Sequence, residues 1–218
     1  MSARVRVKVC CIADRTEARL AIRSGADAVG LVSHMPSGPG VIPEDRIAEI
    51  AADVPPAVGC FLLTSLRDPD QIISQHRRCA TNTLQLCDAV DPAAYSTLRR
   101  ALPGISIVQV IHVTGTSAVE DARHAAPQVD AILLDSGRPD DPTPTLGGTG
   151  RVHDWSLSRK IRDAISTPVF LAGGLDPGNV AEAIERVRPY GVDVCSGIRR
   201  DGALDEGLLE AFLKECGS

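Results

Sequence analysis

Two residues stand where an apolar segment ends and could act as a proton-transfer pair. Cys10 lies in the segment 5–12, in which Arg6, Lys8 and Cys10 alternate with apolar residues and so share one face of a strand. The positive charge of Lys8 would favour the thiolate form of Cys10, which is the form that accepts a proton. The alternative is that Cys10 only fills the core and Lys8 is a structural charge.

The second candidate is Asp135, which follows the apolar run 131–134 and opens the longest loop of the chain, residues 135–153. A carboxyl group buried against apolar strand ends has a raised pKa and can donate a proton. The alternative is a structural role in a cap or an Asx turn. A thiolate and a carboxylic acid on opposite sides of a ligand suit proton abstraction at one face and donation at the other.

Three glycine-containing turns in the last third of the chain are candidates for binding a phosphate. Backbone N–H groups at glycine turns and at helix starts bind anions, although such turns also occur as ordinary links between strands and helices. After the strand 169–172 we expect Asp176 to cap a helix with Pro177 in its first position. The predicted phosphate ligands are Gly148, Thr149, Gly150, Gly173, Gly174, Ser196 and Gly197.

Strand-like and helix-like segments that alternate along the whole chain would position these residues. The strands are predicted at 5–12, 26–32, 57–63, 83–86, 105–111, 130–134, 169–172 and 191–195. The helices are predicted at 14–24, 43–53, 68–79, 92–101, 117–125, 154–165, after 176, and at 203–216. Eight such units favour a single-domain (β/α)₈ TIM barrel over residues 1–218. A doubly wound open sheet would carry its glycines at the first strand-to-helix turn, where residues 10–14 have none.

In a (β/α)₈ barrel the carboxyl ends of the strands face the active site. Cys10 and Asp135 end strands that lie roughly across the barrel, at the end where barrel enzymes bind substrate. Asp27, Asp130 and Asp193 each stand early in a strand, and we expect them at the opposite end, where charges concern stability.

Composition excludes several classes of function. The 218 residues are 44% apolar but only 3% aromatic, with a net charge of −5 and no basic block. The composition therefore argues against nucleic acid and anionic membranes as partners, whereas a small anionic substrate fits. The seven cysteines are odd in number and scattered, with no zinc-site spacing, so we expect a reduced, cytoplasmic protein without a metal. The chain starts directly on a strand and has no apolar run that could span a bilayer.

In several ordered motifs the sequence resembles the phosphoribosylanthranilate isomerase family. The matching segments are 8–10 (Lys-Val-Cys), 25–30, 133–136 (Leu-Leu-Asp-Ser), 147–150 with 154–155, 171–175 with 177 and 179, and 188–194 with 196–197. The resemblance implies a (β/α)₈ barrel that isomerises an N-ribosyl aromatic amine phosphate by an Amadori rearrangement in tryptophan biosynthesis. It also implies Cys10 as general base, Asp135 as general acid, a phosphate on the three glycine turns, and no cofactor.

The chain departs from the family pattern at the end of the site that would hold the aromatic acid. Cys11 replaces a usual glycine, and Pro39 stands where the family's loop usually carries an arginine for the anthranilate carboxylate. Cys87 replaces a usual histidine, and the motif at 195–199 begins with cysteine and ends with Arg199. Lys8 and Arg199 are thus candidates to bind the substrate carboxylate or to tune the pKa of the thiol.

These departures leave three functions open. The first is the pathway isomerase itself, acting on a small phosphosugar. The second is a paralogue that uses the same acid and base on another phosphosugar in specialised metabolism. The third is a catalytically silent phosphate-binding relative. The sequence leaves the oligomeric state open between monomer and homodimer.

Overall fold

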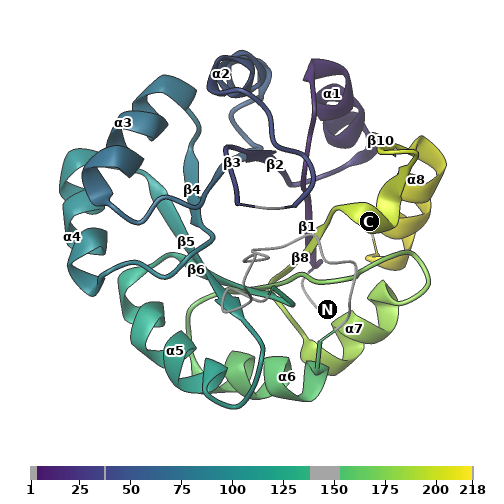
Figure 1. Cartoon of the computed structure of the whole chain (residues 1–218). Coiled ribbons are helices and arrows are strands. Elements are labelled where there is room, and N and C mark those ends of the chain that lie inside the picture. The colour runs from purple at the N-terminus through teal and green to yellow at the C-terminus, as the bar shows by residue number, and fades with distance from the viewer. Residues whose placement is uncertain (1–3, 37, 138–152, 218) are drawn as a thin grey trace.

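The fold, obtained as a computed structural model, is described for residues 4–36, 38–137 and 153–217. Eight parallel strands close into a barrel in chain order, and helices surround it (Figure 1). The strands are β1 (Arg6–Val9), β2 (Ala28–Val32), β3 (Gly59–Thr64), β4 (Thr83–Leu86), β5 (Ser106–His112), β6 (Ala131–Asp135), β7 (Val169–Leu171) and β8 (Gly191–Val194). The predicted TIM-barrel fold is confirmed. That all of residues 1–218 form one domain remains a prediction.

The helices begin close to the predicted positions because aspartate side chains cap them. Asp14, Asp68, Asp91, Asp154 and Asp205 each accept a hydrogen bond from a backbone N–H of the first helical turn. The helices are α1 (Arg15–Ser24), α2 (Glu44–Asp53), α3 (Pro69–Cys79), α4 (Pro92–Ala101), α5 (Ala118–Ala125), α6 (Trp155–Ala164), α7 (Val180–Val187) and α8 (Glu206–Glu215).

Two expected helix starts were wrong. Helix α7 begins at Val180 after Asn179, because Asp176 instead accepts a hydrogen bond from Gly178 N–H in a turn that precedes the helix. The last helix starts at Glu206 rather than near 203, because residues 199–204 form a small antiparallel pair, β9 (Arg199–Arg200) with β10 (Ala203–Leu204).

The apolar core has two layers. One layer lies between the strands and the surrounding helices, and it contains the alternate strand residues Val7 and Val9 of β1. The other fills the inside of the barrel with residues such as Phe61, Val108 and Phe170. Apolar residues on both faces of the strands are typical of a parallel sheet covered by helices. Because alternate residues of β1 face opposite sides of the sheet, Lys8 and Cys10 point into the barrel, as the sequence predicts.

Strand β1 is shorter than the predicted segment 5–12. It ends at Val9, and Cys11 has a φ of 61° in the left-handed region that residues other than glycine seldom adopt. The chain therefore bends sharply after Cys10, which leaves Cys10 at the mouth of the barrel.

Candidate active site

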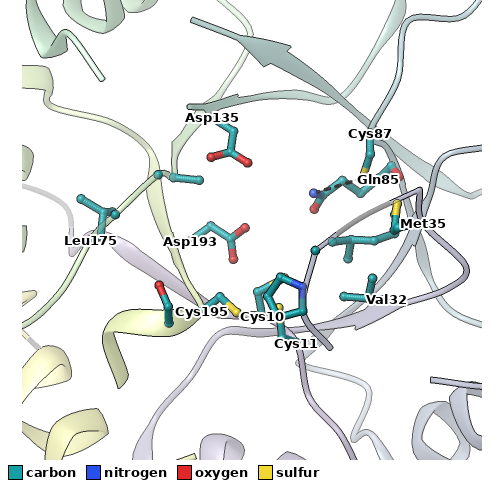
Figure 2. A pocket seen from close by; sticks show the side chains of 17 residues that line it. Cys10, Cys11, Val32, Met35, Gln85, Cys87, Asp135, Leu175, Asp193 and Cys195 are labelled. Atoms are coloured by element: carbon teal, nitrogen blue, oxygen red, sulfur yellow. Dashed lines mark hydrogen bonds between the residues drawn. The ribbon is translucent and has the colours of Figure 1, made fainter. Parts of the chain in front are cut away.

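A pocket opens at the carboxyl ends of the strands, where the barrel fold places its active sites. It encloses about 680 Å³, counting the space that is open to solvent. Figure 2 shows Asp135, Asp193 and Gln85 pointing into this pocket, with Cys10, Cys11 and Cys195 together on one side of it. The structure thus brings Cys10 and Asp135 to the wall of one cavity from opposite parts of the barrel.

Cys10 is buried and held by its backbone. Its N–H donates to the carbonyl of Val194 at 2.8 Å, which continues the pairing of β1 with β8 beyond the last strand residue. Gly30 of β2 leaves the space that this thiol occupies. A Cβ added at Gly30 would lie 2.8 Å from Cys10 Sγ and 3.0 Å from Lys8 Nζ. The Cys10 thiol and the Lys8 ammonium group therefore both lie in the space that a side chain at Gly30 would fill.

Asp135 is the last residue of β6 and is only 7% exposed. Burial raises the pKa of its carboxyl group, although the Ser136 N–H, which donates to Oδ1 at 2.7 Å, and the nearby His112 act in the opposite direction. His112 pairs with Asp135 in the register of β5 and β6, a neighbour that the sequence did not single out. The carboxyl group is therefore in an environment that favours its protonated form.

Asp193 was expected at the opposite end of the barrel, and this expectation was wrong. Asp193 is the third residue of the four-residue β8, so it lies inside the barrel and lines the pocket. Its Oδ2 accepts a hydrogen bond from Lys8 Nζ at 2.9 Å. Its Oδ1 is buried without a partner among the described residues. The prediction assumed that a residue early in a strand lies far from its carboxyl end. Because β8 has only four residues, Asp193 already lies next to that end. Asp27 and Asp130, by contrast, line a separate cavity with Arg6.

The two cations proposed for a substrate carboxylate do not line the pocket. Lys8 is fully buried in its pair with Asp193. Arg199 is paired with Glu17, with nitrogen to oxygen distances of 2.9 and 3.0 Å, and donates to the carbonyl oxygens of Cys10 and Cys11. Carboxylates of the chain hold both cations in this structure. A role of Lys8 or Arg199 at the substrate carboxylate or in tuning the thiol pKa remains a prediction. Their local roles are to balance Asp193 and to anchor the backbone at Cys10.

One side of the pocket is apolar. It is lined by Val32, Met35, Pro39, Leu63 and Cys87, and none of the described lining residues is a lysine or an arginine. Gln85 lies beside them with its Oε1 buried and without a partner in the described part of the chain. This side of the pocket is therefore apolar apart from Gln85 and has no described cation.

The glycine turns after β7 and β8 lie against each other. Gly173 and Gly174 have left-handed φ angles of 86° and 64°, and their N–H groups donate to no described residue. A Cβ at Gly197 would overlap the carbonyl oxygen of Leu175, so only glycine permits this close approach of the two loops. Both turns and Ser196 border the pocket. The other predicted phosphate ligands, Gly148, Thr149 and Gly150, lie outside the described residues.

The described residues contain no group of three or more His, Cys, Asp or Glu side chains that could hold a metal ion. None of the described helices is both long and apolar enough to cross a bilayer.

A closed barrel with a thiol, a buried carboxyl group and glycine turns at the carboxyl ends of its strands defines a (β/α)₈-barrel enzyme. The family model described as N-(5′-phosphoribosyl)anthranilate isomerase matches residues 7–215. The chain belongs to this family, as its motifs predict.

Individual relatives agree over nearly the whole chain. The N-(5′-phosphoribosyl)anthranilate isomerase of Haloferax volcanii is 39% identical over 95% of this chain and 91% of its own length. The enzyme of Methanocella arvoryzae is 36% identical over 96% and 97%. The crystal structure of the Thermotoga maritima phosphoribosyl anthranilate isomerase superimposes with a TM-score of 0.84 at 30% identity, covering 98% of both chains.

Proposed function

We propose that Cys10 and Asp135 catalyse the Amadori rearrangement of N-(5′-phosphoribosyl)anthranilate in this chain. As a member of its family, the chain is an aldose-ketose isomerase of tryptophan biosynthesis that acts on a small molecule. The observation that carries the residue assignment is that the thiol and the buried carboxyl group line one pocket from opposite parts of the barrel. A paralogue with another phosphosugar is not favoured, because relatives at this level of identity are isomerases of phosphoribosylanthranilate.

The reaction needs an acid first and a base second. Asp135 donates its proton to the ring oxygen of the ribose, which opens the furanose to an iminium ion. Burial supports this role, because a raised pKa keeps the carboxyl group protonated at higher pH. Cys10, as thiolate, then removes the proton from C2′, and the resulting enolamine tautomerises to the ketone.

The phosphate end of the substrate would bind at the turns after β7 and β8. The N–H groups of Gly173 and Gly174, free of described partners, support this assignment, and Ser196 and Gly197 complete the turn beside them. Gly148, Thr149 and Gly150 remain proposed phosphate ligands. The aromatic ring would then lie along the apolar side of the pocket near Met35 and Pro39.

Fluorescence-monitored turnover of phosphoribosylanthranilate tests the assignment. Cys10→Ser and Asp135→Asn should each lower kcat by about 10²- to 10⁴-fold while the chain stays folded. Near-normal turnover by either variant would remove that residue from its role. Absence of turnover in the unmodified chain would support the silent relative instead. Light scattering on the same sample would distinguish a monomer from a homodimer, both of which remain proposals.

A further inference from the structure

Three thiols lie together at the rim of the pocket, on the ends of the two strands that close the barrel. The register pairs Lys8 with Asp193 and Val9 with Val194, and the next residues along are Cys10 and Cys195. Adjacent strands are about 4.8 Å apart, so the backbone of Cys195 lies next to that of Cys10, and Cys11 follows directly at the turn after β1. Figure 2 shows Cys10, Cys11 and Cys195 side by side at this rim.

Cys11 lies beside the other two thiols. Figure 2 shows its side chain next to those of Cys10 and Cys195 at the pocket. Its left-handed backbone is held by Arg199, which donates to the Cys11 carbonyl at 2.6 Å. Gly40 packs directly on it, since a Cβ there would lie 2.5 Å from Cys11 Cβ. The Cys11 side chain therefore has little freedom to move away from its neighbours.

Cys195 differs from the other two thiols in exposure and in electrostatic environment. It is half-buried, whereas Cys10 and Cys11 are each only 6% exposed. The neighbouring Cys11 thiol and the positive charge of Arg199 lower the pKa of the Cys195 thiol against the effect of burial. Partial exposure next to a cation is typical of reactive cysteines. Among the three, Cys195 is the thiol that an oxidant from solvent reaches first.

We propose that Cys195 and Cys11 form a hydroperoxide-reactive pair that closes into a disulfide at the pocket rim. The Cys195 thiolate attacks one oxygen of the hydroperoxide, and the O–O bond breaks to give a sulfenic acid and, after protonation, water or an alcohol. The Cys11 sulfur then displaces the sulfenic oxygen, which leaves as water with the Cys11 proton. Two thiols are oxidised to one disulfide, one hydroperoxide is reduced, and an added dithiol reverses the change.

The disulfide would affect the pocket through the neighbour of Cys11. Cys10 precedes Cys11 directly, and the Arg199 hydrogen bonds hold both carbonyl oxygens. A link from Cys11 to the end of β8 would constrain the backbone that positions the Cys10 thiol, so turnover should fall on oxidation and return on reduction. This consequence rests on the proposed function, whereas the formation of the disulfide does not.

The test oxidises the full chain with hydrogen peroxide, alkylates the remaining thiols and locates the cross-link by mass spectrometry. We expect it in the unmodified chain and in Cys10→Ser, and not in Cys11→Gly or Cys195→Ser. Cys11→Gly should fold because glycine accepts the left-handed φ of that position. Cys216→Ser, a thiol just after α8 and outside the pocket lining, is the matched control and should retain the cross-link.

A cross-link that persists in Cys195→Ser or Cys11→Gly would overturn the proposal, as would one that requires Cys10. Oxygen addition at scattered thiols without a cross-link would overturn it too. Because the readout is covalent structure, the result stands apart from turnover. A chain that forms the disulfide but does not isomerise phosphoribosylanthranilate would contradict only the proposed function.

Discussion

Lys8 Nζ lies 2.9 Å from Asp193 Oδ2, in a buried ion pair that joins the first and last strands of the barrel next to Cys10. Burial alone would lower the pKa of Lys8, but the negative charge of Asp193 raises it above the usual value. The pair therefore keeps a charged lysine inside the barrel.

Removing one partner of this pair should destabilise the fold strongly. Lys8→Met leaves Asp193 buried without its cation, and we expect the free energy of unfolding to fall by about 3–5 kcal/mol. The double variant Lys8→Met/Asp193→Leu should recover part of this loss, because it leaves no unpaired buried charge. Urea unfolding of both variants and of Asp193→Leu completes the double-mutant cycle. A loss in the double variant equal to the sum of the two single losses would show that the two residues are not coupled.

Asp135→Asn should stabilise the protein at neutral pH while it lowers kcat by about 10²- to 10⁴-fold. Burial raises the folded-state pKa of Asp135, so the native state loses stability as pH rises from the unfolded value of about 3.9 through the folded pKa. Asparagine has no such titration. The difference in unfolding free energy between the variant and the unmodified chain should be smallest below about pH 3.9 and grow with pH. Urea titrations at several pH values measure it, and parallel curves would contradict it.

Arg199 should matter far more for stability than the adjacent Arg200. Arg199 is 9% exposed and makes two hydrogen bonds to Glu17 as well as bonds to backbone carbonyls, so Arg199→Ala should cost about 3–5 kcal/mol. Arg200 is 71% exposed in its pair with Asp205, and Arg200→Ala should cost less than about 1 kcal/mol. Thermal and urea unfolding of both variants provide the comparison. Similar losses would refute the anchoring role of Arg199.

Gly197→Ala should weaken substrate binding at the phosphate end. The added Cβ would overlap the Leu175 carbonyl and push the loop after β8 away from the loop after β7. Loss of a charge-assisted hydrogen bond to the phosphate would raise KM by about tenfold or more. Gly115→Ala is the matched control, because a Cβ there has open space and no left-handed backbone. An unchanged KM in Gly197→Ala would place the phosphate elsewhere.

Pro39→Arg should improve binding of phosphoribosylanthranilate. Pro39 lines the pocket, whose described lining contains no lysine or arginine, and an arginine there could meet the substrate carboxylate. A charge-assisted pair contributes about 1.5–3 kcal/mol, so KM should fall by about tenfold to a hundredfold. Pro39→Gln controls for the loss of proline without adding charge. If both variants behave alike, the carboxylate does not bind at this position.

The sequence by itself determined the barrel, its eight strands and most helix starts. Apolar runs of strand length and aspartate caps are local signals, so they could be read without knowing what packs where. The same signals placed Cys10 and Asp135 at strand ends, and the order of motifs identified the family.

Only the tertiary structure decided which charges meet. Asp193 lies 185 positions from Lys8 in the chain, and Arg199 lies 182 positions from Glu17, so no local pattern could show that carboxylates hold these two cations. The left-handed turn at Cys11, which gathers the three thiols, likewise depends on the Arg199 hydrogen bond and the packing of Gly40. Contacts between distant segments arise when the barrel closes, and for that reason the sequence predicted the strand ends but not the partners that occupy them.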